Sequence, residues 1–176
     1  MHLSARRILV AGVSGSGKTT LSGRISERLG VPCVEMDDLH WGPGWTPRET
    51  FLDDVAALAA EDEWVTEWQY RAARPVMLAR AEVVVWLDLP TRVTMARVVR
   101  RTLRRRLRRE TLWSAGNVEP PLRSILTERD HIVRWAWRTR HTYRAGALSL
   151  WEQPDVEVIR LRSTREVERW LASLES

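Results

Sequence analysis

Short apolar runs alternate along the chain with longer segments in which apolar residues recur every three or four positions. The short runs are typical of buried parallel strands, and the longer segments are typical of helices packed on them. This alternation predicts an α/β fold. The predicted strands are Ile8–Ala11, Val31–Met36, Glu63–Glu67, Ala81–Leu89 and Val156–Leu161. The predicted helices are Thr20–Leu29, about 47–60 behind a capping box at Thr46–Glu49, Arg74–Arg80, one from Thr91, about 130–145, and one capped by Ser163–Glu166.

The segment Gly12–Thr19 lies between the first predicted strand and helix and fits the pattern G-x-x-x-x-G-K-[ST]. Its glycines let backbone N–H groups turn toward phosphate oxygens, and the helix N-terminus adds positive potential. In this pattern Lys18 reaches the β- and γ-phosphates, and the hydroxyl of Thr19 binds Mg²⁺. The alternative, a glycine-rich turn formed by chance, is disfavoured by the strand and helix on either side. The residues expected to bind nucleotide here are Gly12, Ser14, Gly15, Ser16, Gly17, Lys18, Thr19 and Thr20.

The use of basic residues supports this interpretation. Lys18 is the only lysine in the chain, whereas the other strongly basic side chains are all arginine. A composition that prefers arginine elsewhere keeps a compact ammonium at this position, where phosphate binding needs one.

Length and composition predict one globular domain over residues 1–176. Met1–Arg7 leads directly into the first strand, and no apolar run is long enough to span a membrane, so we expect a cytoplasmic protein. The single cysteine, Cys33, allows no internal disulfide, and its place in a predicted strand favours a buried apolar role.

Carboxylates follow two of the predicted strands. Val31–Met36 leads to Asp37 and Asp38, and ligands of open α/β sheets bind at the carboxyl ends of strands. A carboxylate there can accept a proton from an acceptor hydroxyl or hold Mg²⁺ through water, although each aspartate could instead begin a turn. Asp88 fits the pattern of a second Mg²⁺-associated carboxylate, or it caps the following helix. The candidate metal ligands are therefore Thr19, Asp37 and Asp88.

Two loops are expected beside these carboxylates. Glycines and a proline mark the loop Leu39–Trp45. Its Trp41 and Trp45 could stack on a flat substrate or cover the sheet edge. The loop after the third strand brings Glu67, Gln69 and Arg71 toward the same crevice.

The middle of the chain is rich in arginine, with nine arginines over Arg92–Arg109. Val99, Leu103 and Leu107 form an apolar stripe in this predicted helix. Arg97, Arg101, Arg104 and Arg108 fall on one line of the same helix. Three interpretations compete: a lid that places guanidinium groups over phosphates, a nucleic-acid-binding surface, and a solvated basic face. We favour the lid, and the three are not exclusive.

A second arginine-bearing helix, about 130–145, follows the glycine- and proline-containing loop Leu112–Pro121. It carries Arg134, Arg138, Arg140 and Arg144, together with Trp135, Trp137 and Tyr143. Two such helices joined by a loop predict a helical hairpin that opens and closes, which makes a lid inserted at about 100–140.

These motifs resemble the adenylate-kinase-like branch of P-loop kinases, and within it the group known as DNA topology modulation proteins. The resemblance covers nearly the whole chain. It is carried by Gly12–Thr19, Asp37–Trp41, Pro43–Trp45, Trp64-Val65 before Tyr70, Leu87–Pro90, Arg97–Arg109, Gly116-Asn117 with Glu119, and Arg134–Arg138. The chain departs from the subgroup at Trp68-Gln69, where a glycine-asparagine pair is usual, and at Val118, where arginine is usual.

The resemblance implies a three-layer α/β/α fold with a parallel five-stranded sheet and a mobile lid, and Mg-ATP as the phosphoryl donor. Lys18 and Thr19 match the family directly, and Asp37 matches an acidic position that contacts acceptor or metal. Arg97, Arg101, Arg134 and Arg138 match lid arginines in type and region. The expected catalytic residues are Lys18, Asp37, Arg97, Arg134 and Arg138, and the expected nucleotide contacts outside the loop are Arg101 and Ser163.

Our leading hypothesis is an ATP-dependent kinase that acts on a small-molecule acceptor, with a nucleotide or nucleoside among the candidates. The rival is a nucleic-acid-associated NTPase whose arginine helix holds DNA or RNA. A third alternative is a nucleotide sensor that closes its lid without consuming ATP. The carboxylates at strand ends favour the kinase.

Overall fold

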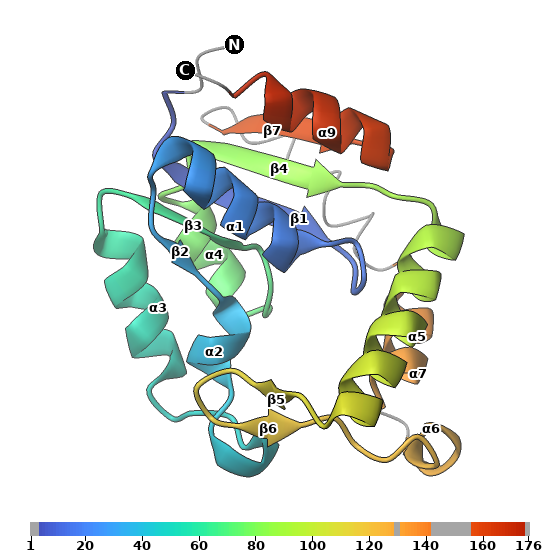
Figure 1. Ribbon diagram of the computed structural model, residues 1–176. Coiled ribbons are helices and arrows are strands. Elements are labelled where there is room, and N and C mark those ends of the chain that lie inside the picture. The colour runs from blue at the N-terminus through green and yellow to red at the C-terminus, as the bar shows by residue number, and fades with distance from the viewer. Residues whose placement is uncertain (1–3, 129–130, 142–155, 175–176) are drawn as a thin grey trace.

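The centre of the molecule is a parallel sheet of five strands in the order β2-β3-β1-β4-β7 (Figure 1). The computed structural model describes residues 4–128, 131–141 and 156–174. Its strands in this sheet are β1 (Arg7–Gly12), β2 (Cys33–Val34), β3 (Trp64–Glu67), β4 (Val83–Leu87) and β7 (Glu157–Leu161). The α/β fold and the five-stranded parallel sheet are therefore confirmed.

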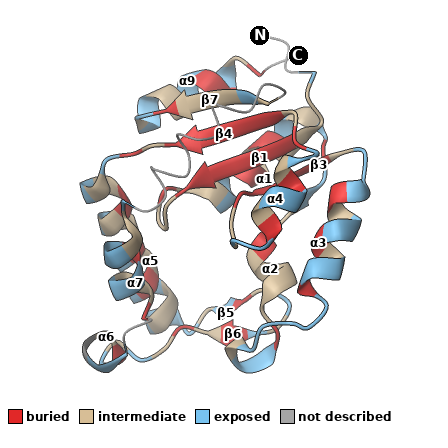
Figure 2. Cartoon of the chain, turned by 180° about the vertical axis from the view of Figure 1, so that it is seen from behind, coloured by how far each residue is buried: buried red, intermediate tan, exposed pale blue. Residues whose placement is uncertain are grey.

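Helices cover both faces of this sheet, because successive side chains of a strand point to opposite sides. Ile8 and Val10 of β1 pack toward α1 (Lys18–Leu29) and α9 (Thr164–Ala172). Leu9 and Ala11 pack toward α3 (Phe51–Ala60) and α4 (Ala73–Leu78). Figure 2 shows the buried strands between the more exposed helices, which gives the three layers that the resemblance implied.

The remaining elements form two extensions beyond the carboxyl ends of the strands. One contains α2 (Met36–His40) and the 3-10 turn η1 (Pro43–Trp45). The other, which we call the lid, spans residues 91–139 and contains α5 (Thr91–Arg108), β5 (Thr111–Leu112), β6 (Asn117–Val118), α6 (Ser124–Thr127) and α7 (Ile132–Thr139). Helix α7 packs along α5, and the β5-β6 hairpin reaches across to α2 (Figure 1). Within the described ranges, no helix has the length and apolar character needed to cross a membrane.

The second predicted strand is much shorter than the sequence pattern suggested. Strand β2 pairs only with β3, through Cys33 and Val34, and Met36 already begins α2. The N–H of Met36 donates to the Glu67 carboxylate at 2.9 Å, which turns the chain out of the sheet. The prediction that Asp37 and Asp38 follow a strand directly is therefore wrong, because both lie in the first turn of α2. The prediction that Cys33 is buried is also wrong, since it is exposed on this edge strand.

The predicted capping box at Thr46–Glu49 does not start a helix. Trp41 and Pro47 form an isolated antiparallel bridge, and the N–H of Arg48 donates to the carbonyl of His40 at 2.8 Å. These contacts hold the segment extended, so α3 begins later, at Phe51, with Thr50 as its N-cap residue.

The apolar stripe predicted in the arginine-rich helix is exposed rather than buried. Val99, Leu103 and Leu107 are 39%, 41% and 79% exposed, whereas the buried side chains of α5 are Thr94, Val98 and Thr102. The buried face of α5 packs closely against the glycine-rich loop, where only small side chains fit. This packing determines which residues of α5 face inward. The predicted loop at Leu112–Pro121 contains the β5-β6 hairpin. The second arginine helix is confirmed as α7, and residues 130 and 142–145 of its predicted range lie outside the described residues.

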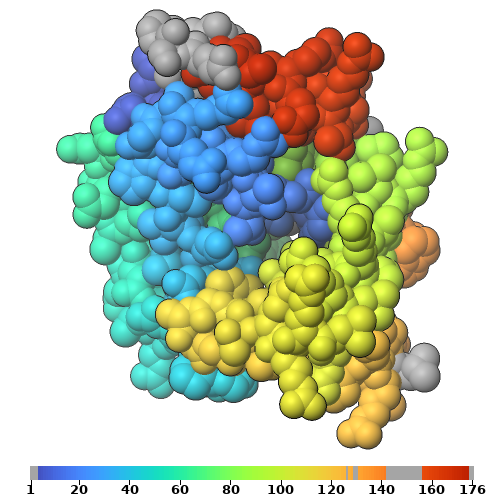
Figure 3. Space-filling view, viewed as in Figure 1, coloured from blue at the N-terminus to red at the C-terminus, as the bar shows by residue number. Residues whose placement is uncertain are grey.

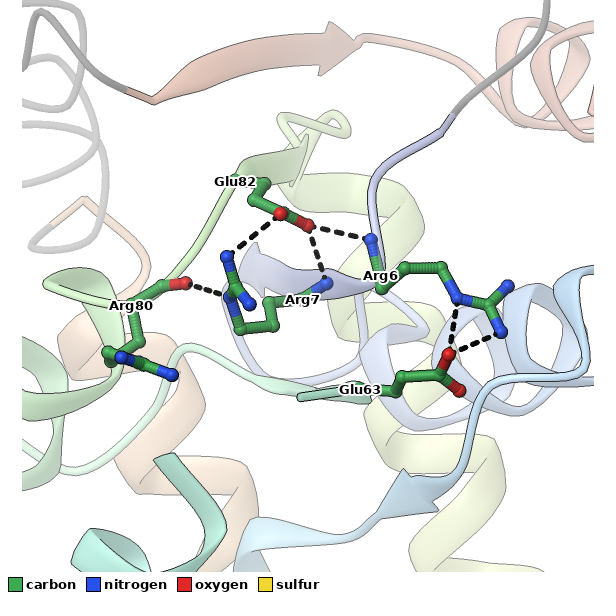
Figure 4. Close-up of polar contacts among 5 residues, drawn as sticks. All are labelled: Arg6, Arg7, Glu63, Arg80 and Glu82. Carbon is green, nitrogen blue, oxygen red and sulfur yellow. Dashed lines mark hydrogen bonds and ion pairs between the residues drawn. The ribbon is translucent and has the colours of Figure 1, made fainter. Parts of the chain in front are cut away.

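The amino-terminal edge of the sheet is held by a charged network (Figure 4). Glu82 accepts hydrogen bonds from the N–H groups of Arg6 and Arg7 at 2.7 and 2.9 Å, and the Arg7 guanidinium binds the same carboxylate. Arg6 pairs with Glu63 at 2.7 Å. The network joins the beginning of β1 to the segments that precede β3 and β4.

We expect Glu82→Gln to lower the free energy of unfolding by about 1 kcal/mol at neutral pH, because an amide replaces a carboxylate that accepts charge-assisted bonds. Desolvation alone would raise the pKa of Glu82, but the N–H groups of Arg7 and Arg6 and the Arg7 guanidinium lower it overall. A lowered folded-state pKa means that this stabilisation is present above the ordinary value of 4.5 and is lost as the pH falls through the folded-state pKa. Urea denaturation at several pH values measures this, with exposed Glu61→Gln as the control. A pH-independent difference would contradict the prediction.

Candidate active site

The segment between β1 and α1 has the backbone that phosphate binding requires. Gly15 has φ +76°, and a Cβ added there would lie 2.3 Å from the carbonyl oxygen of Thr94. Gly17, at φ +98°, is the N-cap residue of α1, and no side chain caps this helix. Only glycine adopts these conformations at low cost, so the loop leaves the first N–H groups of α1 available to an anion.

Two polar groups of this loop have no partner among the described residues. The hydroxyl of Ser16 is buried without a hydrogen bond, and Lys18 makes no hydrogen bond or ion pair. Desolvation lowers the pKa of Lys18, while the negative charges of Glu67 and Asp37 oppose that effect. A buried hydroxyl and a desolvated ammonium beside a helix N-terminus fit a bound phosphate chain.

The lid helix brings two of the predicted arginines to this loop. Arg97 donates to the carbonyl of Ser16 and to the hydroxyl of Thr164, both at 3.0 Å. Arg101 lies one turn further along, and its Nε is buried without a hydrogen bond to any described residue. Desolvation lowers the pKa of Arg101, and Glu119 and Asp37 act in the opposite direction. Arg104 and Arg108 are exposed. Of the four arginines predicted to lie on one line of the helix, Arg97 and Arg101 therefore face the loop and the other two face solvent.

Glu67 is a site residue whose importance the sequence did not single out. It ends β3, is 3% exposed, and accepts a hydrogen bond from the Thr19 hydroxyl at 2.8 Å. It is also the largest opposing influence on the pKa of Lys18. A signal was present, because Glu67 ends an apolar strand just as Asp88 follows one. The sequence alone does not show which of these two carboxylates lies next to Thr19, because that depends on the Thr19 side chain turning toward β3.

Asp88, in contrast, is bound by an arginine. Its Oδ2 accepts hydrogen bonds from Nε and Nη2 of Arg160, whose guanidinium also lies over the Trp86 ring. The described residues contain no group of three or more His, Cys, Asp or Glu side chains that could hold a metal ion by themselves. Mg²⁺ is commonly held by one or two carboxylates together with substrate phosphates and water, and Thr19 with Glu67 fits that pattern. The metal role of Asp88 stays a prediction without a supporting contact.

Asp37 belongs to a hydrogen-bonded group near the loop. Its Oδ1 accepts from the Gln69 amide and, at 2.6 Å, from the Tyr70 hydroxyl. Burial raises the pKa of Tyr70, and the Asp37 charge raises it further, so the phenol remains a donor. His40 stacks on the Tyr70 ring with centroids 3.9 Å apart. Asp37 Oδ2 has no hydrogen bond to a described residue.

A pocket of about 530 Å³ opens between β2, α2, α5 and the β5-β6 hairpin, and neither Lys18 nor Asp37 is among its lining residues. Its lining includes Glu35, Asp38, Arg105 and Trp113, and Figure 3 shows the molecule hollowed between the core and the lid. Arg71, expected at the crevice, is exposed.

Three other predicted residues lie on α7 and at the start of α9. Arg134 and Arg138 are exposed on α7. The Ser163 hydroxyl accepts the N–H of Glu166 at 3.2 Å and so caps α9, which confirms that cap. The catalytic and nucleotide-binding roles of these residues stay predictions.

A glycine-rich loop between β1 and α1 of a parallel sheet ordered β2-β3-β1-β4-β7, with an arginine-bearing lid, defines the fold of the P-loop kinases. The sequence matches no protein-family model and no curated protein. Among solved structures, the chain is similar to shikimate kinase from Acinetobacter baumannii, with a TM-score of 0.58 and 15% identity over 97% of this chain and 91% of that one. It is similar to shikimate kinase from Bacteroides thetaiotaomicron, with a TM-score of 0.56 and 16% identity over 97% of both chains. A gluconokinase from Sinorhizobium meliloti has a TM-score of 0.51 and 23% identity, over 96% of this chain and 93% of that one. At these identities the similarity establishes the fold alone.

Proposed function

We propose that the protein is a kinase that transfers the γ-phosphate of Mg-ATP to a hydroxyl group of a small-molecule acceptor. One observation carries the proposal. Glu67 accepts hydrogen bonds from Thr19 of the loop and from the N–H of Met36, so Asp37, which follows Met36 and keeps one carboxylate oxygen without a hydrogen bond to a described residue, lies beside the phosphate-binding loop. A phosphate-binding lysine with an acceptor-side carboxylate near it supplies the groups that phosphoryl transfer requires.

The residues divide into donor and acceptor roles. The loop N–H groups, Ser16 and Lys18 bind the phosphates, and Arg97 and Arg101 stabilise charge as it develops on the transferred group. Thr19 and Glu67 would hold Mg²⁺, which would neutralise negative charge on the phosphates of ATP. Asp37 orients the acceptor hydroxyl and accepts its proton, while Tyr70 and Gln69 fix the carboxylate.

The acceptor is inferred only as a class. The similar structures include a shikimate kinase bound to shikimate and a gluconokinase, and both names describe kinases of hydroxylated small molecules. Nucleosides and nucleotides belong to the same proposal through the adenylate-kinase-like resemblance. The finer assignment to the DNA topology modulation group rests on that sequence resemblance.

A binding screen tests this proposal. We would measure the melting temperature with a non-hydrolysable ATP analogue and Mg²⁺, then add shikimate, gluconate, nucleosides or nucleoside monophosphates. A ligand that binds only the folded state raises the melting temperature, so a second increase identifies the acceptor class. Transfer of labelled phosphate to the hit completes the test. No stabilisation by the ATP analogue would contradict the proposal.

The exposed arginines of the lid favour one second candidate, a nucleic-acid-associated NTPase. Arg100, Arg104, Arg108 and Arg109 are exposed on and just after α5. Such a surface predicts DNA or RNA binding that weakens steeply with salt, and ATP hydrolysis stimulated by nucleic acid. ATP hydrolysis at the same rate with and without DNA and RNA would exclude this candidate.

We expect Glu67→Gln to raise the Mg²⁺ concentration needed for half-maximal transfer, or to reduce kcat, by roughly 10- to 100-fold. The amide keeps the shape of the side chain but loses the negative charge beside Thr19 and Lys18. Asp88→Asn is the matched comparison. Glu67 ends β3 and Asp88 follows β4, and these two strands lie on either side of β1. A larger Mg²⁺ effect from Asp88→Asn than from Glu67→Gln would reverse the assignment, provided that both variants keep the parent melting temperature.

A further inference from the structure

The tip of the lid is bonded directly to the segment that carries Asp37. We call residues 113–118 the lid tip and residues 35–45 the acceptor arm. Figure 1 shows the hairpin of the lid tip beside α2 of the acceptor arm, although the two are far apart in the sequence. Ring contacts join them as well, since Trp45 and Trp113 meet edge to face at 5.4 Å.

Asn117 makes the central contact between these two segments. Its Oδ1 accepts the N–H of Trp45 at 3.1 Å, and its Nδ2 donates to the carbonyl of Gly42 at 3.0 Å. The side chain is only 4% exposed, and no other described side chain bonds these two backbone groups. The indole N–H of Trp45 in turn donates to the carbonyl of Val118 in the lid tip, at 3.2 Å.

The backbone held by Asn117 is an unusual one. Gly44 and Trp45 have φ values of +66° and +62°, and the second is costly for a side chain as large as indole. Such a conformation persists only where its surroundings fix it. Asn117 fixes this backbone with both polar atoms of its side-chain amide, because Oδ1 accepts one hydrogen bond and Nδ2 donates the other.

A second contact fixes the other end of the acceptor arm. Ser114 donates its N–H and its hydroxyl to Asp38 Oδ1, at 2.8 and 2.7 Å. The Trp113 indole donates to Glu35 at 3.2 Å. Asp38 and Glu35 lie within two residues of Asp37, so the lid tip constrains the turn of α2 on which Asp37 is carried.

We propose that Asn117 is a positioning residue: through Gly42 and Trp45 it holds the acceptor arm in the conformation in which Asp37 faces the phosphate-binding loop. This inference rests on the proposed kinase function and deepens it, because the acceptor site is then completed by the lid rather than preformed in the core. It also gives a role to the Gly116-Asn117 pair and to Trp45.

Hydrogen exchange of the acceptor arm tests the positioning role without any substrate. Asn117→Ala removes two hydrogen bonds, and we expect the amides of residues 36–46 to exchange about tenfold faster. Ser124→Ala is the matched control, because Ser124 is a buried lid residue that bonds only within the lid, to the carbonyl of Pro121. Unchanged exchange in the acceptor arm, or equal acceleration in Ser124→Ala, would overturn the proposal.

Steady-state kinetics then separates positioning from general destabilisation. With the acceptor identified by the screen, Asn117→Ala should raise the KM for acceptor about tenfold and leave the KM for ATP within about twofold. Equal changes in both constants would overturn the positioning role. Failure of the kinase proposal is distinguishable, because the parent protein would then transfer no phosphate while the exchange experiment still reports on the acceptor arm.

Discussion

Replacing Lys18 with alanine is expected to reduce phosphoryl transfer by about 10³-fold or more, which corresponds to ~4 kcal/mol of lost transition-state stabilisation. Lys18 is the only ammonium of the loop and has no ion-pair partner among the described residues. Charge on the transferred phosphoryl group would therefore lose its closest compensating cation. Initial rates of phosphate transfer from labelled ATP measure the effect.

The control for this variant is Arg24→Ala on the same helix. Arg24 pairs with Glu168 at 2.6 Å and ties α1 to α9 at the surface, away from the loop. It should retain transfer close to the parent rate, so a loss confined to Lys18→Ala identifies the loop ammonium as the cause. If Lys18→Ala transferred phosphate as fast as the parent, the proposed function would be wrong.

Replacing Asp37 with asparagine is expected to reduce kcat by roughly 10²- to 10⁴-fold, the range associated with loss of a general base. The asparagine side chain keeps the size of aspartate and can still accept the Tyr70 hydrogen bond, but it has no negative oxygen for the acceptor proton. The affinity for ATP should change little, because the phosphates are bound by the loop and the lid arginines. Transfer rates and ATP titrations on the same protein separate the two effects.

Asp54→Asn is a suitable comparison for Asp37→Asn. Asp54 also lies in the first turn of a short helix and also accepts a hydroxyl hydrogen bond, from Thr50 at 2.9 Å. Its carboxylate is bound by Thr50 and Arg48 rather than by the groups around Asp37, so its replacement should leave kcat unchanged. A kcat for Asp37→Asn within about threefold of the parent would show that Asp37 is not the proton acceptor.

The sequence predicted the strand, glycine-rich loop and helix at residues 7–29 well, because their signals are local. The loop pattern, the strand before it and the helix after it are consecutive in the chain, and their chemistry requires fixed residue types at fixed spacing. Strands β1 and β4 were found for a similar reason, since each is an apolar run with clear ends, and β7 was found from its alternation of apolar and polar residues.

The acceptor half depends on contacts between distant segments, which periodicity does not reveal. Met36 leaves the sheet because its N–H meets Glu67, which is 31 residues away. The buried face of α5 is set by Gly15, whose missing side chain admits Thr94 and Val98 and turns Val99 outward. Glu67 joins Thr19 only because β3 and β1 are neighbours in the sheet. In each case tertiary packing overrides the local pattern.

The presence of a single lysine makes the loop chemically addressable. A reagent that modifies amines can react with the chain only at its amino terminus and at Lys18. Desolvation lowers the pKa of Lys18, so a larger fraction of this amine is neutral and nucleophilic than at an ordinary surface lysine. One added acyl or aryl group at this position would therefore report directly on occupancy of the phosphate site, and bound nucleotide would shield it.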